Sequence, residues 1–324
     1  MSADSTVDSL LCLARRTPDW DAPKAEWQAA DIAETDLVPL LRGADAVIHL
    51  AWAFQPTHDP AATWRTNVLG GIRVFEATAA AGVPALVHAS SVGAYSPGPK
   101  DRPVDESWPT DGWPGAAYTR EKAYLERVLD AFEPRHPECR VVRLRPAFIF
   151  QREAAQEQRR IFGGPLVPSV DMRRLPAVPD IPGLRFQTVG AADVAEAYRL
   201  AALGDARGAF NIAADPPIGT PELADLFDAH SVRVPAPLVR AAVAVGWHLN
   251  LVPASPGLFD AVLRLPIMDT TRARTELGWT PRQSATEALE EFFAGLREGG
   301  GLSTAPLAER SGSRVREFLT TRRR

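Results

Sequence analysis

Short apolar runs alternate with longer amphipathic stretches through the first half of the chain, and this alternation limits its possible folds more than any other feature. Four runs are typical of buried strands: residues 9–14, 45–51, 85–91 and 140–146. Helical periodicity lies between them, at residues 35–43, 61–82 and 115–133, and the first two of these stretches end at a glycine that suits a helix C-terminus. Strands that alternate with helices in this way predict a parallel sheet with helices on both faces, an α/β fold.

The pattern changes after residue 150. Prolines cluster in residues 165–183, and the helical segments that follow are shorter and alternate less regularly with strands. We therefore predict that residues 1–150 form the sheet domain and residues 151–300 a smaller, mainly helical region. Residues 301–324 are expected to form a flexible tail.

The composition excludes several classes of partner. The net charge is −4 and acidic and basic residues are mixed along the chain, so neither nucleic acid nor a membrane surface is expected, and a small-molecule substrate fits better. Cys12 and Cys139 lie apart in apolar surroundings and indicate neither a disulfide framework nor a metal site. The sequence shows no leader and no apolar stretch of the roughly 20 residues that a membrane span needs. We expect a cytoplasmic protein.

Tyr118 and Lys122 lie four residues apart in the helical stretch 115–133, so their side chains share one face. The chain has four tyrosines and only three lysines, so a Tyr-x-x-x-Lys pair is expected by chance only about 0.04 times. The plain alternative is that Lys122 snorkels beside an exposed Tyr118. In this arginine-rich chain, an ordinary exposed cation would more often be arginine.

A tyrosine and a lysine at this spacing can act together in proton transfer. A phenol has a pKa near 10, and bringing it close to 7 needs about 3 units, or roughly 4 kcal/mol, part of which a nearby lysine can supply. Tyr118 so tuned can give a proton to an alcohol oxygen, or take one from it, while a hydride moves to or from a nicotinamide. Ser90 and Ser91 end the strand 85–91 and can hold the same oxygen, because strand carboxyl ends collect ligands in open α/β sheets.

Several segments carry a wider pattern: AADIAE, DAVIHLAW, RTNVLGGIRVFEAT, HASSVGAYS, the Tyr118 and Lys122 pair, RLRPAFIF, FNIAAD and MDTTRARTELGWTPRQSATEAL. Together they resemble the NAD-dependent epimerase/dehydratase family of the extended short-chain dehydrogenase/reductase superfamily, over nearly the whole chain. The resemblance implies a Rossmann-like, doubly wound dinucleotide-binding domain in residues 1–150 and a substrate-binding region in residues 151–300. It also implies an oxidoreductase-type enzyme, an epimerase or ketoreductase that acts on a sugar or a secondary-metabolite alcohol.

The same resemblance assigns roles to residues. Tyr118 is implied as the acid/base, Lys122 as the partner of the phenolate and of the cofactor ribose, and Ser91 as the donor to the substrate oxygen, with Ser90 supporting the turn. The implied cofactor contacts are Asp31, Ile32, Leu50, Ala51, Ala53, Asn67, Tyr118, Lys122 and Pro146. Asp31 has the alternative role of a turn or cap residue, and Asn67 that of a buried structural amide.

Arg15 and Arg16 follow the strand 9–14, where NAD-preferring folds carry an acid for the ribose 2′-hydroxyl. Arginine at this place suits a 2′-phosphate, so NADP is the expected cofactor and NAD the alternative. The two arginines could instead be exposed residues that lead into a loop. The helical stretches 61–82 and 115–133 resemble the family's dimer surface, so a homodimer is expected.

The start of the chain departs from the family pattern. The family opens with a strand, a Gly-x-x-Gly-x-x-Gly loop and a helix whose N-terminus holds the pyrophosphate, and the strand 9–14 corresponds to the second strand of that pattern. We expect its edge and that of strand 45–51 to stay unpaired unless they close up or another segment fills the gap. Either the true start lies upstream or the chain is a truncated relative. In the second case, a non-catalytic binding or sensor protein of the same fold is the alternative function.

Two further features bear on the substrate. Val92 and Gly93 follow Ser91, where the dehydratase subgroup places an Asp-Glu pair, so elimination of water is not expected. Four arginines could meet a substrate phosphate or form ion pairs instead: Arg173, Arg174, Arg185 and Arg272.

Overall fold

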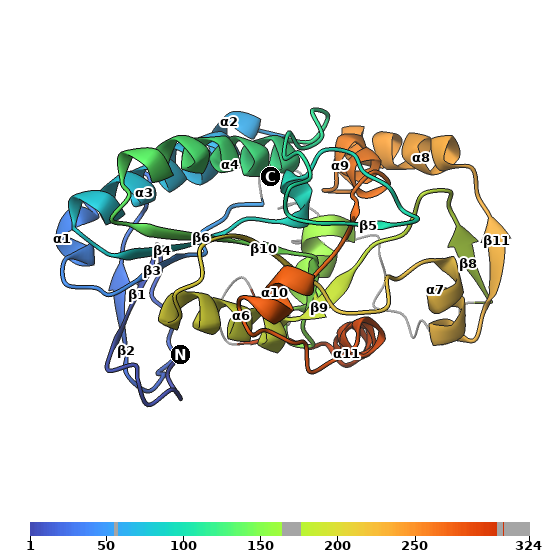
Figure 1. Cartoon of the computed structure of the whole chain (residues 1–324). Helices are drawn as coiled ribbons and strands as arrows, with labels where there is room; N and C mark the ends of the chain where they lie inside the picture. The colour runs from blue at the N-terminus through green and yellow to red at the C-terminus, as the bar shows by residue number, and fades with distance from the viewer. Residues whose placement is uncertain (55–57, 164–175, 303–306, 308–324) are drawn as a thin grey trace.

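The computed structural model describes residues 1–54, 58–163, 176–302 and 307. A sheet of four strands, in the order β10-β6-β4-β3, forms its centre. The strands are β3 (Val47–His49), β4 (Ala85–Ala89), β6 (Arg140–Pro146) and β10 (Gly208–Ile212). All neighbouring pairs are parallel, which confirms the predicted α/β fold with a Rossmann-like parallel sheet (Figure 1).

Helices cover both faces of the sheet (Figure 1). One face carries α3 (Gly70–Ala80) and α4 (Ala117–Arg135), and the other carries α6 (Ala191–Leu203). Adjacent strand residues point to opposite faces, so Leu86 of β4 joins the apolar cluster of Phe75 and Leu129 from α3 and α4. The next residue, Val87, joins the cluster that contains Ala197 of α6. Burial on both faces explains why the strands read as short continuous apolar runs.

The predicted helices of the first half differ in how regular they are. The stretch 61–82 consists of α2 (Pro60–Trp64), the π-helical turn η1 (Arg65–Leu69) and α3. The stretch 35–43 holds only the single turn α1 (Val38–Leu41). The stretch 115–133 is the long helix α4, which starts two residues later than predicted.

The first two strands form a separate parallel pair, β1 (Leu10–Ala14) with β2 (Ala25–Ala29). Among the described residues, β1 and β3 make no ladder with each other, so the two facing edges do not close up. Residues 1–7 instead contact Lys24, which directly precedes β2, and helix α6. The Lys24 amine donates to the carbonyls of Asp4 and Val7, and the Asp4 carboxylate pairs with Arg199 of α6.

The sheet extends beyond the predicted boundary at residue 150, because α6 and β10 follow that residue in sequence. Three small parallel pairs surround it: β7 (Phe148–Phe150) with β9 (Thr188–Gly190), β8 (Ala177–Asp180) with β11 (His230–Arg233), and β5 (Pro103–Val104) with β12 (Ile267–Met268). The other elements are η2 (Val92–Ala94), α5 (Ala155–Gln158), η3 (Arg159–Gly163), α7 (Thr220–Phe227), α8 (Ala236–His248), α9 (Pro256–Val262), α10 (Thr271–Thr275) and α11 (Ala285–Glu298). Apart from residues 301, 302 and 307, the predicted tail lies outside the described residues.

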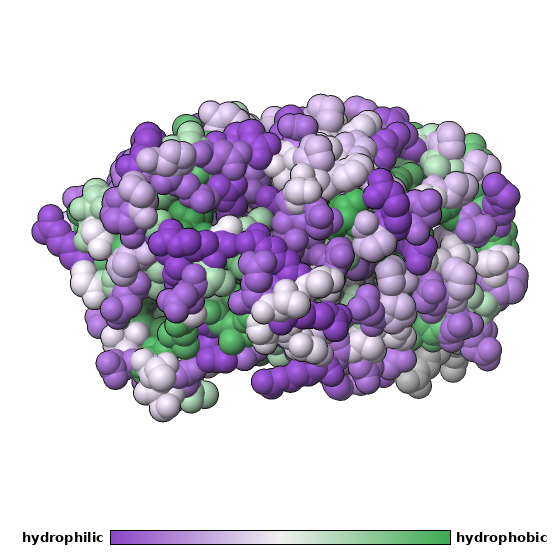
Figure 2. Space-filling view, in the orientation of Figure 1, coloured by the Kyte–Doolittle hydropathy of each residue, from purple (hydrophilic) through white to green (hydrophobic). Residues whose placement is uncertain are grey.

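The surface agrees with the mixed charge of the sequence. On the face that Figure 2 shows, hydrophilic residues dominate and hydrophobic residues form separate patches. No helix within the described ranges combines the length and the apolar character that crossing a bilayer requires.

Candidate active site

Ser91 and Tyr118 meet at the carboxyl edge of the central sheet. β4 ends at Ala89, and the Ser91 hydroxyl caps the turn η2 by accepting the Gly93 N–H at 2.9 Å. The Tyr118 hydroxyl, on the first turn of α4, donates to Ser91 Oγ at 2.9 Å. A Cβ at position 93 would lie 2.7 Å from Tyr118 Cε1, so this approach of the ring needs a glycine. The structure thus joins two of the three predicted catalytic residues directly.

Lys122 lies one turn further along α4 and is buried, with 4% of its surface exposed. Its Nζ donates to the carbonyl of Ala89 at 2.7 Å and lies 3.5 Å from the ring centroid of Trp52. Burial lowers the pKa of Lys122 to about 7, against the opposing effect of the nearby carboxylates of Glu126 and Glu121. Near neutral pH, Lys122 is therefore a titrating amine and not a permanent cation.

The phenol of Tyr118 does not have the lowered pKa that the sequence suggests. Burial raises its pKa to about 12, and the hydrogen bond with Ser91 opposes this only in part. Lys122 Nζ lies 5.9 Å from the centroid of the Tyr118 ring and is directed at Ala89 and Trp52. Tyr118 is consequently a neutral proton donor at pH 7 in this arrangement.

Lys122→Met is expected to raise the free energy of unfolding at pH 7 by about 2–4 kcal/mol, because it removes a buried amine. Lysine in an unfolded chain titrates near 10.4, above the folded value of about 7. Between these values the unfolded chain binds more protons, so the stability of the wild type rises with pH in this window. The advantage of methionine should be full below pH 7 and absent above about pH 10.5. Urea unfolding at pH 6.5 and pH 10.5 measures it, and an equal difference at both values would contradict the buried-amine account.

Aromatic rings surround Tyr118. The ring of Phe54 stacks on it with centroids 5.2 Å apart and planes 13° apart, and Trp52 meets it at 79° with centroids 5.6 Å apart. Phe162 packs edge-on against Phe54. These rings were not predicted from the sequence, although Trp52 and Phe54 flank the predicted contact Ala53.

Asn67 fixes the backbone between those two rings. Its side-chain carbonyl accepts the Ala53 N–H at 2.7 Å, and its amide donates to the Ala53 carbonyl at 2.9 Å and to the Glu121 carboxylate at 2.7 Å. The other carboxylate oxygen of Glu121 accepts the Thr63 hydroxyl. Asn67 is fully buried, and these contacts match the alternative role of a structural amide.

A buried ionic network, which was not predicted from the sequence, lies behind the site. Glu126 has no exposed surface. Its carboxylate accepts the Ser90 hydroxyl at 2.5 Å and two guanidinium N–H groups of Arg145, at 2.9 Å each. Arg143 also donates to Glu126, at 3.1 Å. The signal was present in residues 140–146, because two arginines inside a buried strand require an acidic partner.

The remaining predicted contacts are spread along the carboxyl edges of the strands. Asp31 follows β2, and one of its carboxylate oxygens caps the turn by accepting the Ala33 N–H. The neighbouring Ile32 lies so close to Gly70 that a Cβ there would be 2.8 Å from Ile32 Cγ1. The others lie after neighbouring strands: Arg15 and Arg16 are exposed after β1, Leu50 and Ala51 are exposed after β3, and Pro146 is buried at the end of β6.

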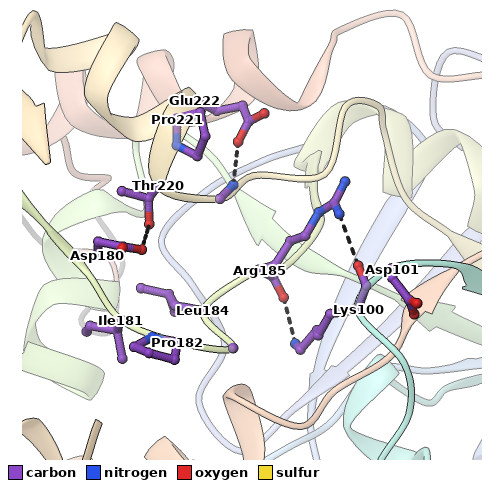
Figure 3. A pocket seen from close by; sticks show the side chains of 12 residues that line it. Lys100, Asp101, Asp180, Ile181, Pro182, Leu184, Arg185, Thr220, Pro221 and Glu222 are labelled. Atoms are coloured by element: carbon purple, nitrogen blue, oxygen red, sulfur yellow. Dashed lines mark hydrogen bonds between the residues drawn. The ribbon is translucent and has the colours of Figure 1, made fainter. Parts of the chain in front are cut away.

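Of the four arginines proposed for a substrate phosphate, Arg185 and Arg272 lie within the described residues. Arg173 and Arg174 lie outside the described residues. Arg272 is held by the carbonyls of Ala209 and Arg207 and by the Glu276 carboxylate. Arg185 lines a separate hollow of about 540 Å³ and donates to the carbonyl of Lys100 (Figure 3).

A nicotinamide cofactor fits one end of this site better than the other. The Ser91–Tyr118 pair and the buried Lys122 have the chemistry that its reacting end needs. At the phosphate end, the first glycine of the chain is Gly43, and β1 connects to β2 through residues 15–24 without a helix. The described residues therefore hold the candidate catalytic cluster, whereas residues 1–54 contain no glycine-rich turn for a pyrophosphate.

Comparison with known proteins identifies the family. Residues 3–162 match the model of the NAD dependent epimerase/dehydratase family. An uncharacterised protein of Mycobacterium tuberculosis is 28% identical over 295 residues, which cover 84% of this chain and 72% of that protein. The UDP-glucose 4-epimerase of Mycolicibacterium smegmatis is 28% identical over 301 residues, 84% of each chain.

A solved structure shows the same fold. The UDP-glucose 4-epimerase of Thermus thermophilus, in complex with NAD, has a TM-score of 0.61 and 20% identity, over 85% of this chain and 86% of that chain. At this identity the likeness concerns the fold alone. With the match over residues 3–162, the chain belongs to the NAD dependent epimerase/dehydratase family.

Proposed function

We propose that this chain is an NAD(P)-dependent epimerase or ketoreductase that acts on a sugar or a secondary-metabolite alcohol or ketone through Ser91, Tyr118 and Lys122. The observation that supports this most is the 2.9 Å hydrogen bond between Tyr118 Oη and Ser91 Oγ at the carboxyl edge of β4. Two hydroxyls at that separation can both reach one substrate oxygen.

The bound cofactor would supply or accept the hydride. In the reducing direction Tyr118, neutral at pH 7, donates its proton to the substrate carbonyl oxygen as that oxygen gains charge, and Ser91 donates a hydrogen bond to the same oxygen. In the oxidising direction Tyr118 has to accept the proton of a substrate hydroxyl. That step needs a lower phenol pKa, which the ammonium of Lys122 can provide when it is directed toward the ring.

A sugar nucleotide is the first substrate class to test, because the Mycolicibacterium smegmatis relative is a UDP-glucose 4-epimerase. Elimination of water is disfavoured, since Val92 and Gly93 bring neither an acid nor a base to the position after Ser91. A homodimer through α3 and α4 and a cytoplasmic location are proposed on the sequence features described above.

The second candidate is a non-catalytic binding or sensor protein of the same fold. It would apply if residues 1–54, in which the first glycine is Gly43, had to bind the pyrophosphate without any further segment. Nicotinamide fluorescence during titration with NADH and NADPH distinguishes the two candidates. The chain as it stands is compared with one that carries a family-like first strand and glycine loop before residue 1. If neither chain bound either dinucleotide, the enzyme would be excluded and the second candidate retained.

Cofactor choice is tested by a double variant, Arg15→Ser with Arg16→Ser. If these exposed arginines meet a 2′-phosphate, the loss of charge-assisted hydrogen bonds should weaken NADPH binding about tenfold and leave NADH binding unchanged. Dissociation constants from isothermal titration measure this. Equal constants for NADH and NADPH in the unsubstituted chain would instead identify the two arginines as loop residues.

A further inference from the structure

Trp52 covers the amine of Lys122. The 3.5 Å between Lys122 Nζ and the centroid of the Trp52 ring is a close cation–π approach. One of the three ammonium donors is used on the Ala89 carbonyl, and the indole occupies another side of the same nitrogen. Trp52 also meets the ring of Tyr118, so a single side chain contacts both members of the proton-transfer pair.

The backbone next to Trp52 is anchored, whereas the side chain is only partly buried. The two hydrogen bonds between Asn67 and Ala53 fix the chain immediately after Trp52. Leu50, two residues before it, is 57% exposed. With Ala53 fixed, any departure of the indole from Lys122 has to occur by rotation about its own side-chain bonds.

We propose that Trp52 is a gate residue: its indole covers the Lys122 amine in the free protein and has to leave it before a cofactor ribose can hydrogen-bond there. The covering rests on the geometry alone, whereas the nature of the incoming ligand rests on the proposed function. The gate also explains why the Lys122 amine is not directed at Tyr118, its predicted partner. While the indole is in place, the ammonium is held at Ala89 and Trp52, and nothing offsets the burial of the phenol except Ser91.

The covering is tested without any cofactor. The chain has only three lysines, Lys24, Lys100 and Lys122, so acetylation by an N-hydroxysuccinimide ester can be followed at each by peptide mass spectrometry. The rate at Lys122 is measured from pH 6 to pH 10.5, where the midpoint reports protonation and the limiting rate reports access. In Trp52→Ala the limiting rate at Lys122, relative to that at Lys100, should rise at least threefold. An unchanged limiting rate would overturn the gate.

Trp64→Ala is the matched control. Trp64 is also partly buried and packs on a tyrosine of α4, Tyr124, at 4.9 Å between ring centroids. The aromatic rings that the Lys122 ammonium faces within the described residues are those of Trp52 and Tyr118. Removal of the Trp64 indole should therefore leave the labelling of Lys122 unchanged. Trp52→Phe, which keeps a smaller ring, should give an intermediate rate and guards against a folding defect in the alanine variant.

The second measurement is dinucleotide affinity by isothermal titration. Removal of a partly desolvated cation–π contact that competes with the ligand should tighten binding about threefold to thirtyfold in Trp52→Ala. Weaker or equal binding in that variant would overturn the gate. If no variant bound dinucleotide, with or without the added first strand and glycine loop, while Lys122 labelling still rose, the covering would stand and the proposed function would fail, so the two failures are distinguishable.

Discussion

Tyr118→Phe is expected to lower kcat/KM about 10²–10⁴-fold for any substrate that the wild type converts, because it removes the only phenolic oxygen that contacts Ser91 in the described structure. The ring remains, so the stack with Phe54 and the contact with Trp52 are preserved. Steady-state kinetics and far-UV circular dichroism measure activity and folding together.

Tyr124→Phe serves as the control for that variant. Tyr124 lies on the same helix, is 45% exposed and packs on Trp64. It should retain full activity. Turnover by Tyr118→Phe within a few-fold of the wild type would remove Tyr118 from the mechanism.

Glu126→Ala is expected to lower the free energy of unfolding by about 3–5 kcal/mol. It removes the buried carboxylate that pairs with Arg145 and Arg143 and leaves both guanidinium groups, 5% and 8% exposed, without it. The Ser90 hydroxyl loses its acceptor as well. Chemical denaturation at pH 7 measures the change.

Glu133→Ala provides the comparison, because Glu133 also pairs with Arg143 but is 38% exposed. An exposed partner contributes little, so this variant should lose less than about 1 kcal/mol of the free energy of unfolding.

The pH dependence of Glu126→Ala gives a second test. Burial alone would raise the pKa of Glu126, but Arg145, Arg143 and Ser90 hold it well below its usual range. A carboxyl whose pKa is lower in the folded protein stabilises the fold at every pH above its pKa in the unfolded chain. This stabilisation is lost only as the pH falls through the pKa of the folded state. The deficit of Glu126→Ala should therefore persist from pH 8 down to pH 5, and a deficit confined to high pH would contradict the pairing.

Local sequence patterns predicted the elements that a single feature determines, either burial on both faces of a strand or the regular period of a helix. The strands β3, β4 and β6 are buried on both faces, so they appear as short apolar runs, and α4 follows the helical period around Tyr118 and Lys122. β2 was not predicted, because its sequence AEWQA includes a charged residue and none of its residues is fully buried. The sequences of α6 and β10 do not differ in kind from the segments around them after residue 150. Only the pairing of β10 with β6 in the folded protein assigns them to the sheet domain.

The site was predictable where spacing along one helix determines the geometry. Tyr118 and Lys122 share a face by their four-residue interval, and Ser90 and Ser91 could be placed near them because β4 ends there. The choice of Ser91 came from the family resemblance. The direction of the Lys122 amine could not be predicted, because it depends on Trp52, which lies far earlier in the chain and approaches only in the folded protein. The sequence could not identify which acid pairs with Arg143 and Arg145 either, because Glu126 comes from a different element.

The contact between Gly93 and Tyr118 constrains how this chain could evolve. A Cβ at position 93 would lie 2.7 Å from the tyrosine ring, so an acidic side chain cannot arise there while the ring keeps its place. The second member of a dehydratase Asp-Glu pair would occupy this position. A glutamate at position 93 would therefore push the Tyr118 ring away from Ser91. An acid at position 93 and the present contact between Tyr118 and Ser91 thus exclude each other unless α4 shifts before residue 93 changes.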